Sequence, residues 1–192
     1  TIADVSGKGI PAALFMMSGK TILKNFVLMA RTADDLAAAM TLANQQLCQN
    51  NEELMFITVF LAMLDLKTGK LIYVSAAHNP PLIYHNGKYE YLPKTKKTFA
   101  LGIRPKFSYQ QDELQMDKGD ILFLYTDGVT EAENVAEELY SNERLEEFLN
   151  DTDKNLPLEE LLAQVRKSIK DYAGEAQQSD DITMLALRFK GK

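Results

Sequence analysis

Apolar and polar residues follow two different periods along the chain, and these periods divide it into helical and extended stretches. Residues 11–30 are mainly apolar, begin with a proline suited to a first helical turn, and predict a helix buried on much of its surface. A second helix is expected after Thr32, a favourable capping residue, with Asp34 and Asp35 near its positive end. Its apolar residues recur at helical spacing: Leu36, Met40, Ala43 and Leu47.

Extended stretches dominate the middle of the chain. Residues 54–65 predict a strand, and a turn at 67–70 leads into a second strand at 71–77. The next apolar stretch contains Asn86-Gly87, a strong signal for a two-residue hairpin turn. Residues 107–117 alternate enough to predict a further strand. Because hairpins outnumber strand–helix–strand crossovers, the sheets are expected to be largely antiparallel.

The last third of the chain combines buried strands with an amphipathic helix. Residues 120–128, DILFLYTDG, predict a buried strand that ends in an Asp-Gly turn. Two helices follow, the later one ending near Gly174, and a polar loop leads into a final strand at 182–189. The later helix has one apolar face, formed by Leu158, Leu161, Leu162, Val165, Ile169 and Tyr172. No repeat or linker interrupts this pattern, so residues 1–192 are predicted to form a single domain.

Composition narrows the classes of partner. The net charge is −6 and the basic residues are scattered, which argues against nucleic acid or an anionic membrane as the main partner. The purely apolar runs fall short of the ~20 residues that span a bilayer, so no membrane span is expected. Cys48 is the single cysteine and cannot form an internal disulfide, which favours the cytoplasm.

Three acidic positions share one context, a carboxylate where an apolar strand meets a turn. Asp4 follows TIA, Asp127 follows ILFLYT, and Asp180-Asp181 precedes ITMLAL. Any one of them is more often a turn residue than a functional one. If the three sites converge, a cation is required, because neighbouring carboxylates raise one another's pKa. Oxygen ligands without a His/Cys cluster favour Mg²⁺ or Mn²⁺, and a pair of such ions suits phosphoryl hydrolysis.

Other motifs are weaker. SGKT at 18–21 ends like a phosphate-binding loop, but it lacks the first glycine and lies inside a predicted helix. His78 and His85 have no partner at metal-ligand spacing and are interpreted as structural or surface histidines. Ser6 has no evident His–Asp relay. Gly7 and Gly9 permit positive φ or close backbone approach beside Asp4.

Five segments in order resemble a known family: DVSGKGIPAALFM, AAHNPPLIY, LGI, GDILFLYTDGVTEAEN and DDITMLALR. Together they resemble the bacterial sigma-regulatory branch of the metal-dependent serine/threonine phosphatases (type 2C, PPM), which includes the stage II sporulation phosphatase. The resemblance covers essentially the whole chain. It implies an α+β fold, a β-sandwich of two antiparallel sheets flanked by paired helices.

The resemblance also implies a site and a reaction. Asp4 would bridge two Mn²⁺ or Mg²⁺ ions, the carbonyl of Val5 would bind one ion, and Asp127 and Asp180 the other, with Gly128 and Asp181 as accessory positions. No catalytic side chain is expected beyond these ligands, because a metal-activated water would attack phosphoserine or phosphothreonine directly. The expected substrate is a phosphorylated regulator of the anti-anti-sigma type.

The chain departs from the family pattern at three places. Two strands and a Gly-Gly-Asp segment normally precede the position of Thr1, so the chain is expected to be N-terminally incomplete and to self-associate through an exposed N-terminal edge. The usual AGH is AAH here, which is interpreted as a packing change at Ala77. Glu133 replaces a residue that is often basic. A non-catalytic interaction module and a small-molecule phosphohydrolase remain alternative functions.

Overall fold

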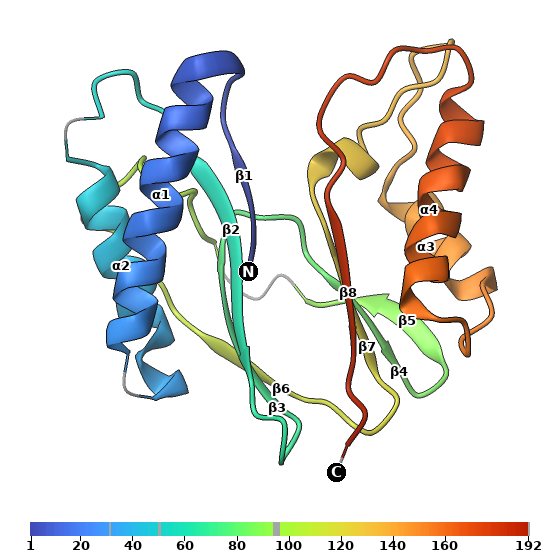
Figure 1. The fold of residues 1–192 in the computed structure, drawn as a ribbon, viewed down its shortest axis with the longest axis horizontal. Helices are drawn as coiled ribbons and strands as arrows, with labels where there is room; N and C mark the ends of the chain where they lie inside the picture. The colour runs from blue at the N-terminus through green and yellow to red at the C-terminus, as the bar shows by residue number, and fades with distance from the viewer. Residues whose placement is uncertain (31, 50, 94–96, 192) are drawn as a thin grey trace. The chain divides into compact units, whose positions relative to one another are not determined.

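The chain folds into two compact units, each with one four-stranded antiparallel sheet and a helix pair (Figure 1). Unit 1 comprises Thr1–His78 and Thr95–Gln115, and unit 2 comprises Asn79–Lys94 and Met116–Lys192. The computed structural model describes residues 1–30, 32–49, 51–93 and 97–191.

The sheet of unit 1 has the order β1-β2-β3-β6. Its strands are β1 (Ile2–Val5), β2 (Ile57–Leu64), β3 (Lys70–Ala76) and β6 (Asp112–Gln115). Strand β1 pairs with β2, and Asp4 lies opposite Thr58. Among the described strands of this sheet, β1 and β6 are therefore the edges. Strand β6 is shorter than the stretch predicted at 107–117.

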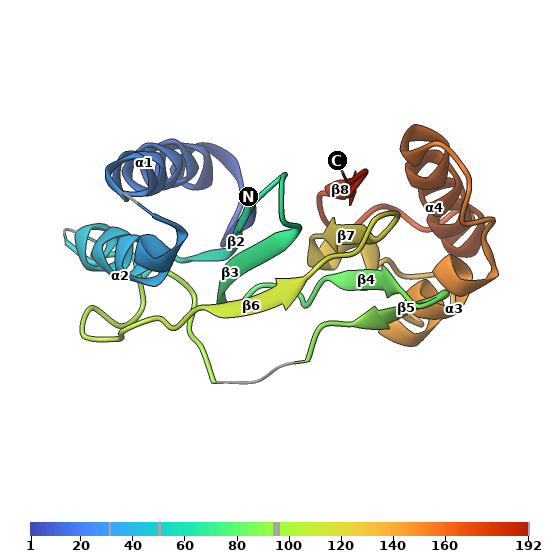
Figure 2. The same ribbon diagram turned by 90° about the horizontal axis from the view of Figure 1, so that it is seen from below.

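The helices of unit 1 are α1 (Gly9–Met29) and α2 (Leu36–Leu47), joined by the 3₁₀ turn η1 (Ala33–Asp35). The predicted start of the second helix is confirmed, since Asp35 Oδ2 accepts a hydrogen bond of 3.1 Å from the Thr32 amide. All four residues of the predicted α2 stripe are buried, and they join the β2 and β3 side chains in the core of this unit. Figure 2 shows α1 and α2 lying side by side on one face of the sheet.

Helix α1 is much less buried than its sequence predicts. Its buried residues are Ala12, Gly19 and Leu23, while one side packs on α2. A helix with apolar residues on all sides buries only the face that meets a neighbour, so the expectation of broad burial is wrong. The large exposed side chains are Ile10, Leu14, Met16, Met17, Leu28 and Met29.

The length and composition of α1 would also allow it to cross a membrane, with a mean hydropathy of 1.2 over its most apolar window. Core helices and N-terminal signal sequences satisfy the same test, so this is weak evidence. The expectation that the chain has no membrane span stays a prediction.

The sheet of unit 2 has the order β5-β4-β7-β8. Its strands are β4 (Leu82–His85), β5 (Lys88–Tyr91), β7 (Ile121–Tyr125) and β8 (Met184–Arg188). The predicted hairpin turn is present, with φ of 50° at Asn86 and 89° at Gly87. Strand β7 lies between β4 and β8, and all five of its residues are buried, as its sequence predicts.

The helices of unit 2 are α3 (Asn142–Asp151) and α4 (Leu158–Ala173), which lie beside the sheet of that unit (Figure 2). The predicted end of α4 is confirmed, because Gly174 follows it with φ of 61°. Tyrosines take part in this core and keep hydrogen-bond partners. The Tyr125 hydroxyl, for example, donates to Asn142 Oδ1 at 2.8 Å. The buried face of α4 consists of Leu161, Val165 and Ile169.

The expected fold class of antiparallel sheets with paired helices is confirmed. The division into two compact units leaves the single-domain expectation a prediction.

Candidate metal centre

Asp127 lies directly beyond the C-terminal end of β7. It opens the 3₁₀ turn η2 (Asp127–Val129), and its carbonyl accepts hydrogen bonds from the amides of Thr130 and Glu131 at 2.9 and 2.8 Å. These backbone bonds hold the turn, while the carboxylate has a different environment. Its Oδ1 atom is buried and makes no hydrogen bond within the described part of the chain. A buried acceptor in this state is costly and is usually explained by a bound ion or water.

Asp180 lies in the loop that precedes β8. A carboxylate oxygen of Asp180 lies within 4.8 Å of one from Asp127, both in unit 2. Asp180 Oδ1 accepts a 2.7 Å bond from the Asp181 amide, and the Asp180 carbonyl accepts one from the side chain of Gln178. The loop therefore fixes the orientation of Asp180 next to Asp127.

Thr126 joins the two segments that carry these acids. Its amide donates to the Thr183 carbonyl at 3.0 Å, and its hydroxyl donates to the Asp181 carbonyl at 3.0 Å. The same hydroxyl accepts the Thr183 amide at 3.0 Å. Thr126 is 3% exposed, so these bonds are shielded from water. The sequence did not predict these hydrogen bonds, which we call the Thr126 clamp, because Thr126 looks like an ordinary strand residue.

Gly128 allows the same two segments to approach closely. A Cβ atom at this position would overlap the carbonyl of Asp181, a backbone atom that cannot rotate away. The accessory position predicted at Gly128 thus has a structural explanation, close packing of the turn on the loop. The carbonyl of Asp181 is already the acceptor for Thr126, and its carboxylate lies outside the cluster that joins Asp127 and Asp180.

The electrostatics of this region suit a cation. Desolvation raises the pKa of Glu131, and the charges of Asp127 and Asp180 raise it further. Such a concentration of negative charge is stabilised by a hard divalent cation, and the donors are carboxylate oxygens, the ligands that Mg²⁺ and Mn²⁺ prefer. Together with the buried Oδ1 of Asp127, this donor set fits a metal ion.

Asp4 and Val5 belong to unit 1. They are the last residues of β1, and the chain then turns at Gly7 and Gly9, whose φ values of 79° and 76° confirm the predicted need for glycine. The Ser6 hydroxyl accepts the Phe56 amide at 2.8 Å, a structural role. Because the acidic pair lies in unit 2, the convergence of Asp4 and the Val5 carbonyl on it stays a prediction.

The structure also shows the surroundings of His78, Ala77 and His85, three positions interpreted from the sequence. His78 is buried, and its Nδ1 lies 2.9 Å from the Thr58 hydroxyl, which agrees with a structural histidine. The interpretation of AAH as a packing change stays a prediction, and the structure adds that Ala77 has a left-handed φ of 54°, which is strained for alanine. His85 does have ligand-type neighbours, Asp117 and Asp120. Only the strand register brings these together, so sequence spacing gave no signal.

Comparison with known proteins identifies relatives over nearly the whole chain. Protein IcfG of Synechocystis is 29% identical, over 97% of this chain and 33% of its own length. Phosphoserine phosphatase RsbU of Bacillus subtilis is 32% identical, over 98% of this chain and 55% of its own length. The chain thus spans about a third to a half of these curated relatives.

Solved structures share the fold. The SiaA-PP2C domain of Pseudomonas aeruginosa has a TM-score of 0.83 and 24% identity, covering 97% of this chain and 74% of its own. The PP2C phosphatase domain of SpoIIE from Bacillus subtilis has a TM-score of 0.76 and 16% identity, covering 97% of this chain and 54% of its own. The family model described as Stage II sporulation protein E (SpoIIE) matches residues 1–190, and the chain therefore belongs to the SpoIIE family, as its motifs predict.

Proposed function

We propose that this chain is the catalytic part of a metal-dependent protein serine/threonine phosphatase. The observation that carries the proposal is the pair formed by Asp127 and Asp180, whose carboxylates lie within 4.8 Å of each other with one oxygen of Asp127 buried and free of hydrogen bonds to the described residues. Membership of the SpoIIE family and the likeness to a phosphoserine phosphatase support the same reaction.

Asp127 and Asp180 would hold one Mn²⁺ or Mg²⁺ ion, and Asp4 and the Val5 carbonyl would complete a two-ion site. Such ions, when bound, lower the pKa of a coordinated water and stabilise negative charge on a phosphoryl group. The chain's own contribution is positional. Thr126 fixes the loop that carries Asp180, and the η2 turn fixes Asp127, so both carboxylates are oriented before a substrate arrives.

The proposed substrate is a regulatory protein phosphorylated on serine or threonine, of the anti-anti-sigma type. Support comes from the relative named as a phosphoserine phosphatase and from the SpoIIE family match. A cytoplasmic location, and self-association through the edge of β1, are further parts of the proposal. Sedimentation velocity tests the latter, since a single monomeric boundary at tens of micromolar protein would contradict it.

The central experiment measures Mn²⁺-dependent phosphate release from a phosphoserine protein. The wild-type chain is compared with Asp180→Asn and with Asp171→Asn, a matched control on the exposed side of α4 where Asp171 pairs with Lys167. We expect release that requires Mn²⁺ or Mg²⁺, is lost in Asp180→Asn and persists in Asp171→Asn.

Two other outcomes distinguish the alternatives. Retained binding of the phosphoprotein with no phosphate release by the wild-type chain under any divalent metal would indicate a non-catalytic interaction module. Rapid hydrolysis of phosphorylated metabolites, not inhibited by a phosphoserine peptide, would indicate a small-molecule phosphohydrolase.

A further inference from the structure

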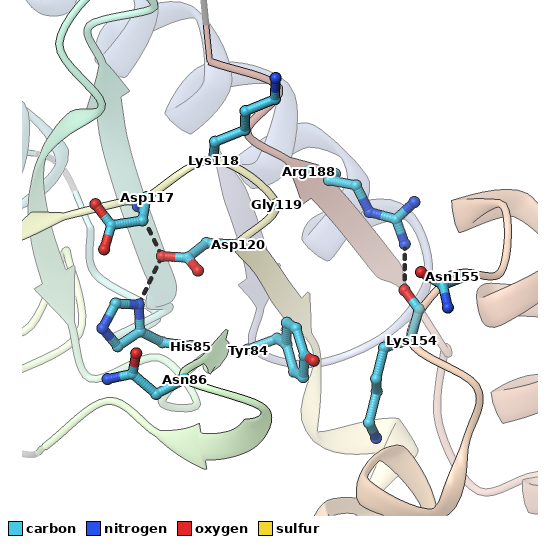
Figure 3. A pocket seen from close by; sticks show the side chains of 10 residues that line it. All are labelled: Tyr84, His85, Asn86, Asp117, Lys118, Gly119, Asp120, Lys154, Asn155 and Arg188. Carbon is cyan, nitrogen blue, oxygen red and sulfur yellow. Dashed lines mark hydrogen bonds and ion pairs between the residues drawn. The ribbon is translucent and has the colours of Figure 1, made fainter.

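A cavity of about 430 Å³ lies at the end of unit 2 where β7 begins (Figure 3). It is bounded by the end of β4, the turn before β7, the loop between α3 and α4, and the end of β8. Asp127 lies beyond the other end of the same strand, at a distance of roughly 20 Å for an extended backbone. The cavity is therefore separate from the candidate metal centre described above.

Three side chains with metal-ligating atoms meet in this cavity. Ligand atoms of His85, Asp117 and Asp120 all lie within 4.8 Å of one another. In Figure 3 the His85 ring and the Asp117 carboxylate lie on the same side of the cavity as Asp120. Asp120 is 6% exposed, which is unusual for a carboxylate and requires strong compensation.

The compensation in this structure comes from two hydrogen-bond donors. Asp120 Oδ2 lies 2.8 Å from His85 Nδ1 and accepts a second 2.8 Å bond from the Asp117 amide. Ligand atoms around a tetrahedral cation with bonds of about 2.0–2.2 Å lie about 3.3–3.6 Å apart. His85 Nδ1 and Asp120 Oδ2 would therefore need to separate by only about 0.5–0.8 Å to share one ion. A metal ion can therefore replace the shared proton, and the half-exposed His85 and the exposed Asp117 can adjust to it.

The basic residues around the cavity have other roles. Arg188 Nη2 donates to the carbonyls of Lys154 and Leu156 at 3.0 and 2.9 Å. The ammonium of Lys154 donates to two carbonyls at the end of α3, those of Leu149 and Asn150. The side chain of Lys118 points away from the acids in Figure 3. The two carboxylates of the cluster thus face one imidazole, which leaves room for further positive charge.

We propose that His85, Asp117 and Asp120 bind one divalent transition-metal ion of the zinc class. The imidazole nitrogen separates this cluster from the oxygen-only pair of Asp127 and Asp180, because nitrogen ligands favour zinc-like ions over magnesium. The ion would connect the end of β4 to the turn before β7 and complete its coordination with water from the cavity. Its role is structural, since it fastens the β4–β5 hairpin to the centre of the sheet.

Zn²⁺ alone is the probe for the test, and Asp127→Asn/Asp180→Asn is the background that removes the other acidic pair. The chain has two histidines, so the imidazole NMR signals of His85 and His78 can be resolved and assigned by substitution. We expect Zn²⁺ to shift the His85 signals at one equivalent and to leave those of the buried His78 unchanged. No change at His85 up to millimolar Zn²⁺ would overturn the proposal.

Single substitutions in the same background identify the ligands. Asp117→Asn keeps the His85–Asp120 pair and hence the fold, and we expect it to weaken Zn²⁺ binding at least about tenfold. His85→Gln should weaken binding further. Glu90→Gln, on the same hairpin and paired with Lys88, is the matched control and should bind like the background protein. Equal Zn²⁺ affinity in Asp117→Asn, His85→Gln and Glu90→Gln would overturn the assignment. These readouts do not depend on phosphatase activity.

Discussion

Strand β7 has a carboxylate just beyond each end, Asp120 before Ile121 and Asp127 after Tyr125, and the two have opposite environments. Asp120 is almost fully buried and has two hydrogen-bond donors on one oxygen, from His85 and from the Asp117 amide. Asp127 has a buried oxygen without a hydrogen bond in the described residues, and a carboxylate oxygen of Asp180 lies within 4.8 Å of one of its own.

In the proposed function, one strand thus carries a stabilising carboxylate at one end and a metal-binding carboxylate at the other. At the Asp120 end, charge is compensated within the chain, so the carboxylate contributes to folding and holds a hairpin in place. At the Asp127 end two like charges lie close together, and in the proposed function a bound metal ion compensates them. Substitutions at each end of β7 can therefore be expected to have different effects.

The largest effect is expected at the Asp127 end. Asp127→Ala removes a proposed metal ligand and should lower phosphate release by more than about a hundredfold, beyond the 10–100-fold typical of groups that only orient a ligand. The measurement is Mn²⁺-dependent turnover on a phosphoserine protein. Near-normal turnover in this variant would show that the chemistry lies elsewhere in the protein.

At the Asp120 end the loss should appear in the free energy of unfolding. Asp120→Ala leaves the His85 ring and the Asp117 amide without their shared acceptor and should cost about 2–4 kcal/mol. Urea unfolding in the presence of a chelator measures this cost free of bound metal. Asp117→Ala, in the same turn but exposed, is the control and should change stability by less than about 0.5 kcal/mol. If both variants lost a similar free energy of unfolding, the stabilising role assigned to Asp120 would be wrong.

Thr126 connects β7 to the acidic pair and should show an intermediate effect. Thr126→Val removes a buried hydroxyl that both donates and accepts, which should cost about 1–3 kcal/mol. Because the loop of Asp180 is then less well fixed, Mn²⁺ affinity should fall severalfold, as calorimetric titration can measure. Thr126→Ser keeps the hydroxyl and should restore most of the affinity. Unchanged Mn²⁺ affinity in the valine variant would limit Thr126 to a role in stability.

The sequence predicted most of the secondary structure for physical reasons that the structure makes plain. The α2 stripe from Leu36 to Leu47 and the α4 face around Val165 have one apolar side each, so their periodicity identifies both the helix and its buried face. Helix α1 is apolar on several sides, so its pattern identifies a helix but not which face is buried. Leu14 and Leu28, for example, are apolar and yet exposed, which the pattern did not predict.

Part of the candidate metal centre could also be predicted from the sequence. Strand ends near turns indicated Asp127 and Asp180, since a carboxylate there is held by rigid backbone. The Thr126 clamp depends on the pairing of distant segments. The contact of His85 with Asp120 likewise depends on which strands pair and in what register, with Tyr84 opposite Ile121. Strands β4 and β7 are far apart in the sequence, so which of their residues pair was not predicted and is seen only in the folded chain.

The smallest effect is expected at Ala77, which belongs to unit 1 and serves as a control for the two ends of β7 in unit 2. Its φ of 54° is left-handed, where a Cβ atom is strained and glycine is not. Ala77→Gly relieves this strain but gives the unfolded chain more freedom, so the net gain should be about 0.5–1 kcal/mol. That corresponds to a rise in melting temperature of roughly 1–4 °C for a chain of this size. Neither Mn²⁺ nor Zn²⁺ affinity should change. A loss of stability would mean that the Ala77 methyl group contributes more packing energy than its backbone strain costs, and would support the interpretation of AAH as a packing change.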